Sequence, residues 1–137
     1  MAYSWITPKT NWTSGDFCTE IDFNRIINNI LYLYDEISLA PLYPDLLPTL
    51  TPSDFVTYDL CNSIKEEVYQ LYAWIDGMSD YSYISNKTVN SSPWGSSELN
   101  TIESILLNCK EILDSGEYVL NYAYAGIEMY GDNNVLI

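Results

Sequence analysis

Apolar residues recur three and four positions apart in three separate stretches of the chain, a spacing that places them on one face of an α-helix. In chain order the stretches contribute Phe23, Ile26, Ile27, Ile30, Leu33, Tyr34 and Ile37, then Cys61, Ile64, Val68, Leu71, Tyr72 and Ile75, then Leu99, Ile102, Leu106, Cys109 and Leu113. The pattern predicts helices over residues 19–40, 52–76 and 96–115. We therefore expect a mainly α fold, built as a three-helix bundle in a single domain over residues 1–137.

Local signals set the expected ends of these helices. Thr19 can cap the first helix, and the three prolines between residues 41 and 48 end it. Thr51 followed by Pro52 predicts the start of the second helix, because proline suits the first helical turn. Thr57 is an alternative start for the same helix. Glycines follow the second and third helices and predict their ends.

The two ends of the chain lack the helical pattern. Residues 1–18 are rich in Trp, Thr, Pro and Asn and predict an extended N-terminal arm with turns. Residues 117–137 alternate tyrosines with other residues and contain a Gly-Asp-Asn-Asn turn signal. We expect a short β-hairpin or an extended tail there. Continuation of the third helix through Tyr122 is the alternative.

The three helical stretches also share a register. Asn24, Asn62 and Asn100 are each 38 residues apart. The same offset aligns Ile26 with Ile64 and Ile102, Ile30 with Val68 and Leu106, Leu33 with Leu71 and Cys109, and Ile37 with Ile75 and Leu113. An internal repeat explains this alignment. Chance is the alternative, because any amphipathic helices can be slid into register.

The charge of the chain excludes some partners. With 5 basic and 19 acidic residues, the formal net charge is −14. Negative charge of this size repels phosphate, so we expect no nucleic-acid binding and no anionic membrane surface as a partner. No apolar run approaches the length of a membrane span. One alternative uses the charge directly: an acidic inhibitor, or DNA mimic, that occupies the basic groove of another protein.

Candidate chemistry is sparse. The chain has no His, which removes the usual general base and the commonest metal ligand. The three cysteines, Cys18, Cys61 and Cys109, lie far apart among apolar residues and predict reduced thiols. A calcium turn at residues 132–134 and a glycosidase-like carboxylate pair are conceivable, but no spacing supports either. We predict no enzyme, no metal and no cofactor.

The helices carry more apolar residues than one buried face needs, for example at residues 30–34 and 105–107. Such an excess predicts contact with another chain. Tryptophans in the arm and loops are further anchors for a protein partner, or stacking surfaces for a carbohydrate. The candidate interface residues are Trp5, Trp12, Phe17, Leu31, Leu33, Trp94, Leu107 and Leu136.

Residues 8–35 contain four motifs that together resemble a known module. They are Pro8-Lys9-Thr10-Asn11-Trp12, Gly15-Asp16-Phe17, Asp22-Phe23-Asn24-Arg25-Ile26 and Asn28-Asn29-Ile30. The module is found in minor structural proteins of phages and prophages of Gram-positive bacteria, many of them tail, baseplate or fibre components. The family usually has an acidic residue after the Arg-Ile pair, whereas this chain has Ile27. That departure widens the apolar face of the first helix.

The resemblance implies a virion protein whose partners are other virion proteins and copies of itself, with no catalytic residue to carry over. In such a protein the N-terminal arm would be a docking element. Asn24 would satisfy backbone groups of this arm, and Arg25 would pair with Asp16 or Asp22. The alternative for Arg25 is a solvated charge.

Overall fold

The computed structural model describes residues 3–37, 49–54, 56–89 and 94–119. Within these residues the regular elements are three α-helices, α1 (Glu20–Ile37), α2 (Tyr58–Trp74) and α3 (Ser96–Asp114), and each packs on the other two. The predicted mainly α, three-helix fold is therefore confirmed. The predicted hairpin or extended tail falls mostly on residues 120–137, which lie outside the described residues, as does Leu136.

The start of α2 differs from the predicted 52–76. The helix begins at Tyr58, where the Thr57 side chain caps it by accepting a hydrogen bond from the Leu60 N–H (3.1 Å). Thr51 and Asp54 instead close a turn, in which the Thr51 N–H donates to the Asp54 carboxylate at 2.7 Å. The alternative start at Thr57 was thus the right one, because its hydroxyl reaches the first helical turn.

The buried faces follow the aligned register. Of the four aligned sets, the first three are 0% exposed at every member: Ile26, Ile64 and Ile102, then Ile30, Val68 and Leu106, then Leu33, Leu71 and Cys109. Equivalent residues therefore meet at the same levels of one core. Residues outside the helices complete this core, namely Trp12, Leu50, Ile84 and Trp94.

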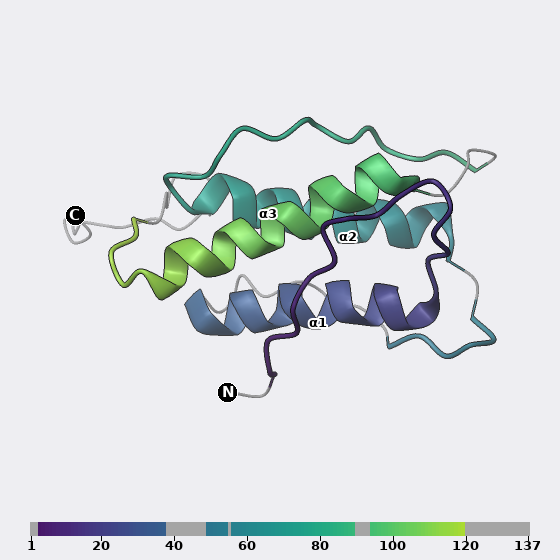
Figure 1. Cartoon of the computed structure of the whole chain (residues 1–137), viewed down its shortest axis with the longest axis horizontal. Helices are drawn as coiled ribbons and strands as arrows, with labels where there is room; N and C mark the ends of the chain where they lie inside the picture. Colours follow the sequence, from purple (N-terminus) through teal and green to yellow (C-terminus); the bar gives the residue numbers. More distant parts are fainter. Residues whose placement is uncertain (1–2, 38–48, 55, 90–93, 120–137) are drawn as a thin grey trace.

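All three helices run in the same direction, and residues 76–89, between α2 and α3, lead back along the outside of the bundle (Figure 1). Two ring contacts agree with this direction. Phe23 stacks on Trp94 at the N-terminal ends of α1 and α3, with ring centroids 5.9 Å apart. Tyr34 meets Trp74 edge-on near the C-terminal ends of α1 and α2, at 5.2 Å. Parallel helices require long return connections, and residues 76–89 form most of the one between α2 and α3.

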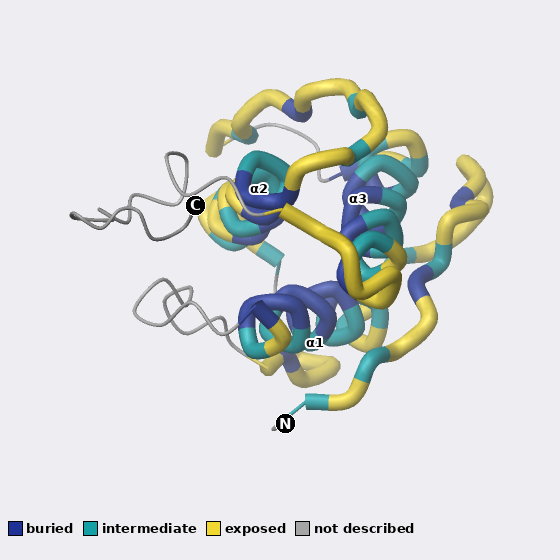
Figure 2. Tube along the Cα trace, turned by 90° about the vertical axis from the view of Figure 1, so that its left-hand side faces the viewer, coloured by how far each residue is buried: buried dark blue, intermediate teal, exposed yellow. Residues whose placement is uncertain are grey.

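We define the N-terminal arm as residues 3–18, the second arm as residues 49–56 without residue 55, and the third arm as residues 76–89. Viewed at 90° to Figure 1, the three helices form a triangle whose buried sides face one another, and extended segments lie outside it (Figure 2). The N-terminal arm bonds to α1 and α3, and the third arm bonds to α2 and α3.

The 38-residue register is a structural repeat. The helices begin at residues 20, 58 and 96, each 38 residues after the last. One asparagine in each helix makes the same pair of hydrogen bonds, at 2.7 to 3.0 Å, to the backbone N–H and C=O of a single arm residue. The pairs are Asn24 with Leu50, Asn62 with Lys87, and Asn100 with Trp12. Chance alignment of amphipathic helices does not explain a shared polar function.

The third repeat is joined to the N-terminal arm. Through the repeated asparagine, α1 and α2 each bind the arm that follows in the chain, whereas α3 binds the N-terminal arm. The prediction that Asn24 holds the N-terminal arm is therefore wrong. It holds the second arm, and Asn100, its equivalent in the third repeat, holds the N-terminal arm. Asn29 adds a second fastening to that arm, with two hydrogen bonds to the Ile6 backbone (3.1 and 2.8 Å).

Candidate functional site

The most heavily bonded polar group in the described core is Glu103, which is 0% exposed. Its Oε1 accepts from the Lys9 backbone N–H (3.1 Å) and from Arg25 Nε (2.8 Å). Its Oε2 accepts from Trp12 Nε1 (2.8 Å) and from Arg25 Nη2 (2.7 Å). These partners replace the hydrogen bonds to water that a carboxylate loses on burial.

This cluster acts as a structural clasp, because it joins the N-terminal arm, α1 and α3 through one carboxylate. Hydrogen bonding to Glu103 raises the pKa of Arg25, so the guanidinium keeps its charge at any ordinary pH. The predicted bond from Arg25 to Asp22 is present at 2.9 Å. Glu103 was not predicted as its partner, because it lies 78 residues away and 19 acidic residues offered no means of choosing.

The equivalent position of the second repeat holds Lys65, which is also buried. Its ammonium donates to the Tyr83 hydroxyl (2.9 Å) and to the Asn86 side chain, both on the third arm. In the first repeat the position holds Ile27. The same site in the fold therefore carries an anion, a cation and an apolar side chain. The two charged versions fasten an arm to a helix.

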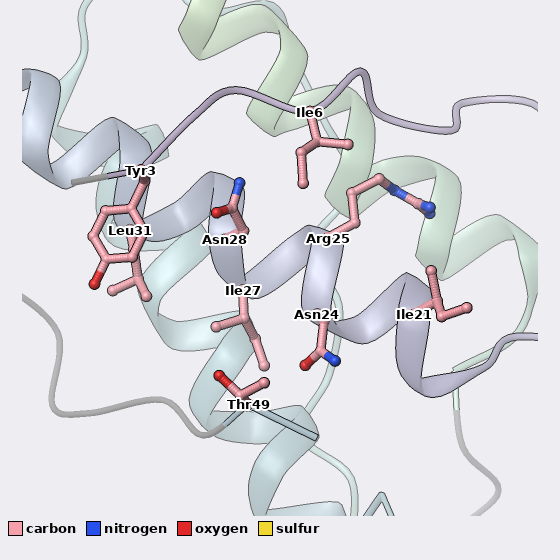
Figure 3. Close-up of a pocket in the computed structure, with 9 residues that line it drawn as sticks. All are labelled: Tyr3, Ile6, Ile21, Asn24, Arg25, Ile27, Asn28, Leu31 and Thr49. Atoms are coloured by element: carbon pink, nitrogen blue, oxygen red, sulfur yellow. The ribbon is translucent and has the colours of Figure 1, made fainter. Parts of the chain in front are cut away.

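A recess of about 450 Å³ lies on the outer face of α1 (Figure 3). The helix supplies the apolar side chains Ile21, Ile27 and Leu31 and the polar side chains Asn24, Arg25 and Asn28, and the flanking arms supply Tyr3, Ile6 and Thr49. Two of these side chains are open to solvent: Ile21 is 68% exposed and Ile6 is 44% exposed. The recess is therefore mostly apolar, and it lies within or beside the segment that resembles the phage module.

A second recess, of about 700 Å³, lies near the N-terminal ends of α1 and α3. It brings together three of the predicted interface residues, Trp12, Phe17 and Trp94. Phe17 is 88% exposed, whereas Trp12 and Trp94 are largely buried and form the floor. The predicted residues Phe17 and Trp94 are thus close in space although 77 positions separate them in the chain.

The other predicted interface residues are dispersed. Leu33 is fully buried in the core, so a partner on the described surface does not reach it. Trp5, Leu31 and Leu107 are half-buried. Trp5 packs on Tyr32, with ring centroids 5.6 Å apart, and Leu31 lines the recess on α1. Ile21 and Ile6 were not among the predicted residues, because single exposed apolar positions have no periodic signal.

The cysteines are free thiols, as the sequence predicts. Burial raises the pKa of the Cys18 thiol to about 12 and also raises the pKa values of Cys61 and Cys109. At neutral pH these thiols therefore stay protonated, which makes them weak nucleophiles and weak metal ligands. Among the described residues no group of His, Cys, Asp and Glu is placed to hold a metal ion.

None of the described helices is long and apolar enough to span a membrane. Comparison with protein-family models, with curated proteins and with solved structures finds no match to this chain.

Proposed function

We propose that this chain is a non-enzymatic structural protein of a phage particle, part of the tail, baseplate or fibres. It would act through contacts with other virion proteins and with copies of itself. The resemblance of residues 8–35 to minor structural proteins of phages supports this proposal from the sequence.

The observation that carries the proposal is the position of Phe17. Its ring is 88% exposed at the rim of a recess floored by Trp12 and Trp94. Burying such a side chain in a contact contributes roughly 2 kcal/mol. Aromatic side chains beside a recess are typical of the central anchors of protein interfaces. Phe17 belongs to the Gly-Asp-Phe motif of the resemblance, so both arguments concern the same residue.

The buried polar groups of the described part support the same function. Glu103, Lys65 and Asn29 are each hydrogen-bonded to an arm. They stabilise a rigid surface, and a rigid surface loses little conformational entropy when a partner binds.

The test is to purify particles from a host whose phage or prophage encodes this chain, and to quantify the chain by mass spectrometry against the major tail protein. The expected result is a fixed ratio of the two proteins. Phe17→Ser should lower the incorporated amount severalfold. Tyr118→Ser, which removes another exposed aromatic ring just beyond the C-terminal end of α3, is the matched control and should leave incorporation unchanged.

Absence of the chain from intact particles would contradict the proposal. Salt-sensitive binding to a basic, DNA-binding host protein would then favour the acidic inhibitor instead. Light scattering over a range of concentrations gives an independent check, because a strict monomer that binds no virion protein would also count against a structural role.

A further inference from the structure

The internal repeat provides a comparison for the outer face of α1. Ile21 stands in the first turn of its helix, and the equivalent residues of α2 and α3 are Asp59 and Ser97. All three positions are exposed. The fold therefore accepts a polar residue here in two repeats out of three. Only α1 exposes an isoleucine, at 68% of its surface.

The same contrast holds six residues later in the helix. The position that carries Lys65 in α2 and Glu103 in α3 carries Ile27 in α1. Ile27 and Ile21 both line the recess of about 450 Å³, together with Leu31. Figure 3 shows the three side chains along this face of the helix, between Ile6 on one arm and Thr49 on the other. At both of these recess-lining positions, the first repeat therefore has an isoleucine where the other two repeats have polar residues.

Packing within the described chain does not account for Ile21. An exposed isoleucine gains little from its own fold, and the two sister helices show that a polar residue fits the position. Apolar side chains gathered in an open recess are instead typical of a binding surface.

We propose that this recess binds a short apolar segment of a different polypeptide, flanked by basic residues. The apolar part of the segment would contact Ile6, Ile21 and Leu31. This inference deepens the proposed function and rests on it, since it names the kind of partner that an assembly protein would recruit.

The net charge of the chain indicates which kind of partner the recess would bind. Each of the five basic residues is already engaged within the chain. Lys9 pairs with Asp16, and Arg25 pairs with both Asp22 and Glu103. Lys87 pairs with Glu98, and Lys110 pairs with Asp114. Lys65 donates a hydrogen bond to the third arm. The net charge of −14 therefore opposes a second copy as the occupant of this recess and favours an occupant that carries positive charge.

The test uses the full chain and a displayed library of random twelve-residue peptides. Peptides selected on the wild-type chain should contain two or three apolar residues between lysines or arginines. Their affinity, measured by fluorescence anisotropy, should fall tenfold or more for the double variant Ile6→Ser/Ile21→Asp. The added aspartate would by itself attract a basic peptide, so a loss of binding reports the apolar contact. Raised salt should weaken binding to the wild-type chain.

Val89→Asp is the matched control, because it adds the same charge at a side chain that is 71% exposed on the third arm. It should bind the selected peptides as the wild type does. The inference is overturned if no peptide is enriched, if the double variant binds equally well, or if the peptides carry acidic flanks. It is also overturned if sedimentation shows a dimer that the double variant abolishes, because a second copy would then occupy the recess. None of these results depends on whether the chain is found in particles.

Discussion

Replacing Glu103 by glutamine tests the clasp that joins the N-terminal arm to α1 and α3. The substitution keeps the size of the side chain but replaces one acceptor oxygen by an NH2 group, which only donates. If the remaining oxygen keeps Lys9 N–H and Arg25 Nε, the new amide faces Trp12 Nε1 and Arg25 Nη2, both donors. Two hydrogen bonds are lost, and donors are left opposing one another.

The magnitude follows from burial. Glu103 is 0% exposed, and hydrogen bonds to charged groups contribute about 1.5–3 kcal/mol each. Removing one partner of a buried ion pair costs about 3–5 kcal/mol. Arg25 retains Asp22 at 2.9 Å, which moderates the loss. We therefore expect Glu103→Gln to lower the free energy of unfolding by about 3 kcal/mol, near the lower end of that range.

Urea denaturation followed by circular dichroism measures this loss. With a slope of about 2 kcal/mol per molar urea, the midpoint should fall by roughly 1.5 M. Asp114→Asn is the control. It removes an ion pair with Lys110 whose carboxylate is largely exposed, and such pairs contribute about 1 kcal/mol or less. If the two variants lose the same small amount, the account of Glu103 as the central contact of the arm is refuted.

Three further predictions concern the arms, the thiols and a turn. Asn100→Ala should speed amide hydrogen exchange across residues 3–12, because both hydrogen bonds to the Trp12 backbone are lost, at a cost of about 2 kcal/mol; unchanged exchange would contradict this. Burial raises the pKa of the Cys18 thiol from 9.0 to about 12, so the folded state favours the protonated thiol. This preference stabilises the folded state fully below pH 9, and the stabilisation is lost as the pH rises toward 12. The urea midpoint should fall over this interval, and less steeply in a Cys18→Ala variant. Gly77→Ala should cost about 1–2 kcal/mol, because Gly77 has a φ of +89°, whereas Gly15→Ala should leave the melting temperature nearly unchanged.

The helices and some of the residues that line the two recesses could be predicted from the sequence. The apolar spacing predicted all three helices, and Thr57 was recognised as one of two starts for α2. Phe17 was named as an interface residue and is the most exposed large apolar side chain of the described part. The partner of Arg25 could not be chosen among 19 acidic residues, since the pairing depends on contacts between elements far apart in the chain.

The sequence by itself determined where the helices form, which faces they bury and at which interval they repeat. These properties depend on local spacing, since side chains three and four positions apart share a helix face. Only the tertiary structure decided that the helices run in parallel, and that the asparagine of each repeat holds an arm. It also placed Glu103 at the junction of arm, α1 and α3, and left Ile21 beside an open recess. Such outcomes depend on the direction in which elements pack, and spacing along the chain contains no information about that direction.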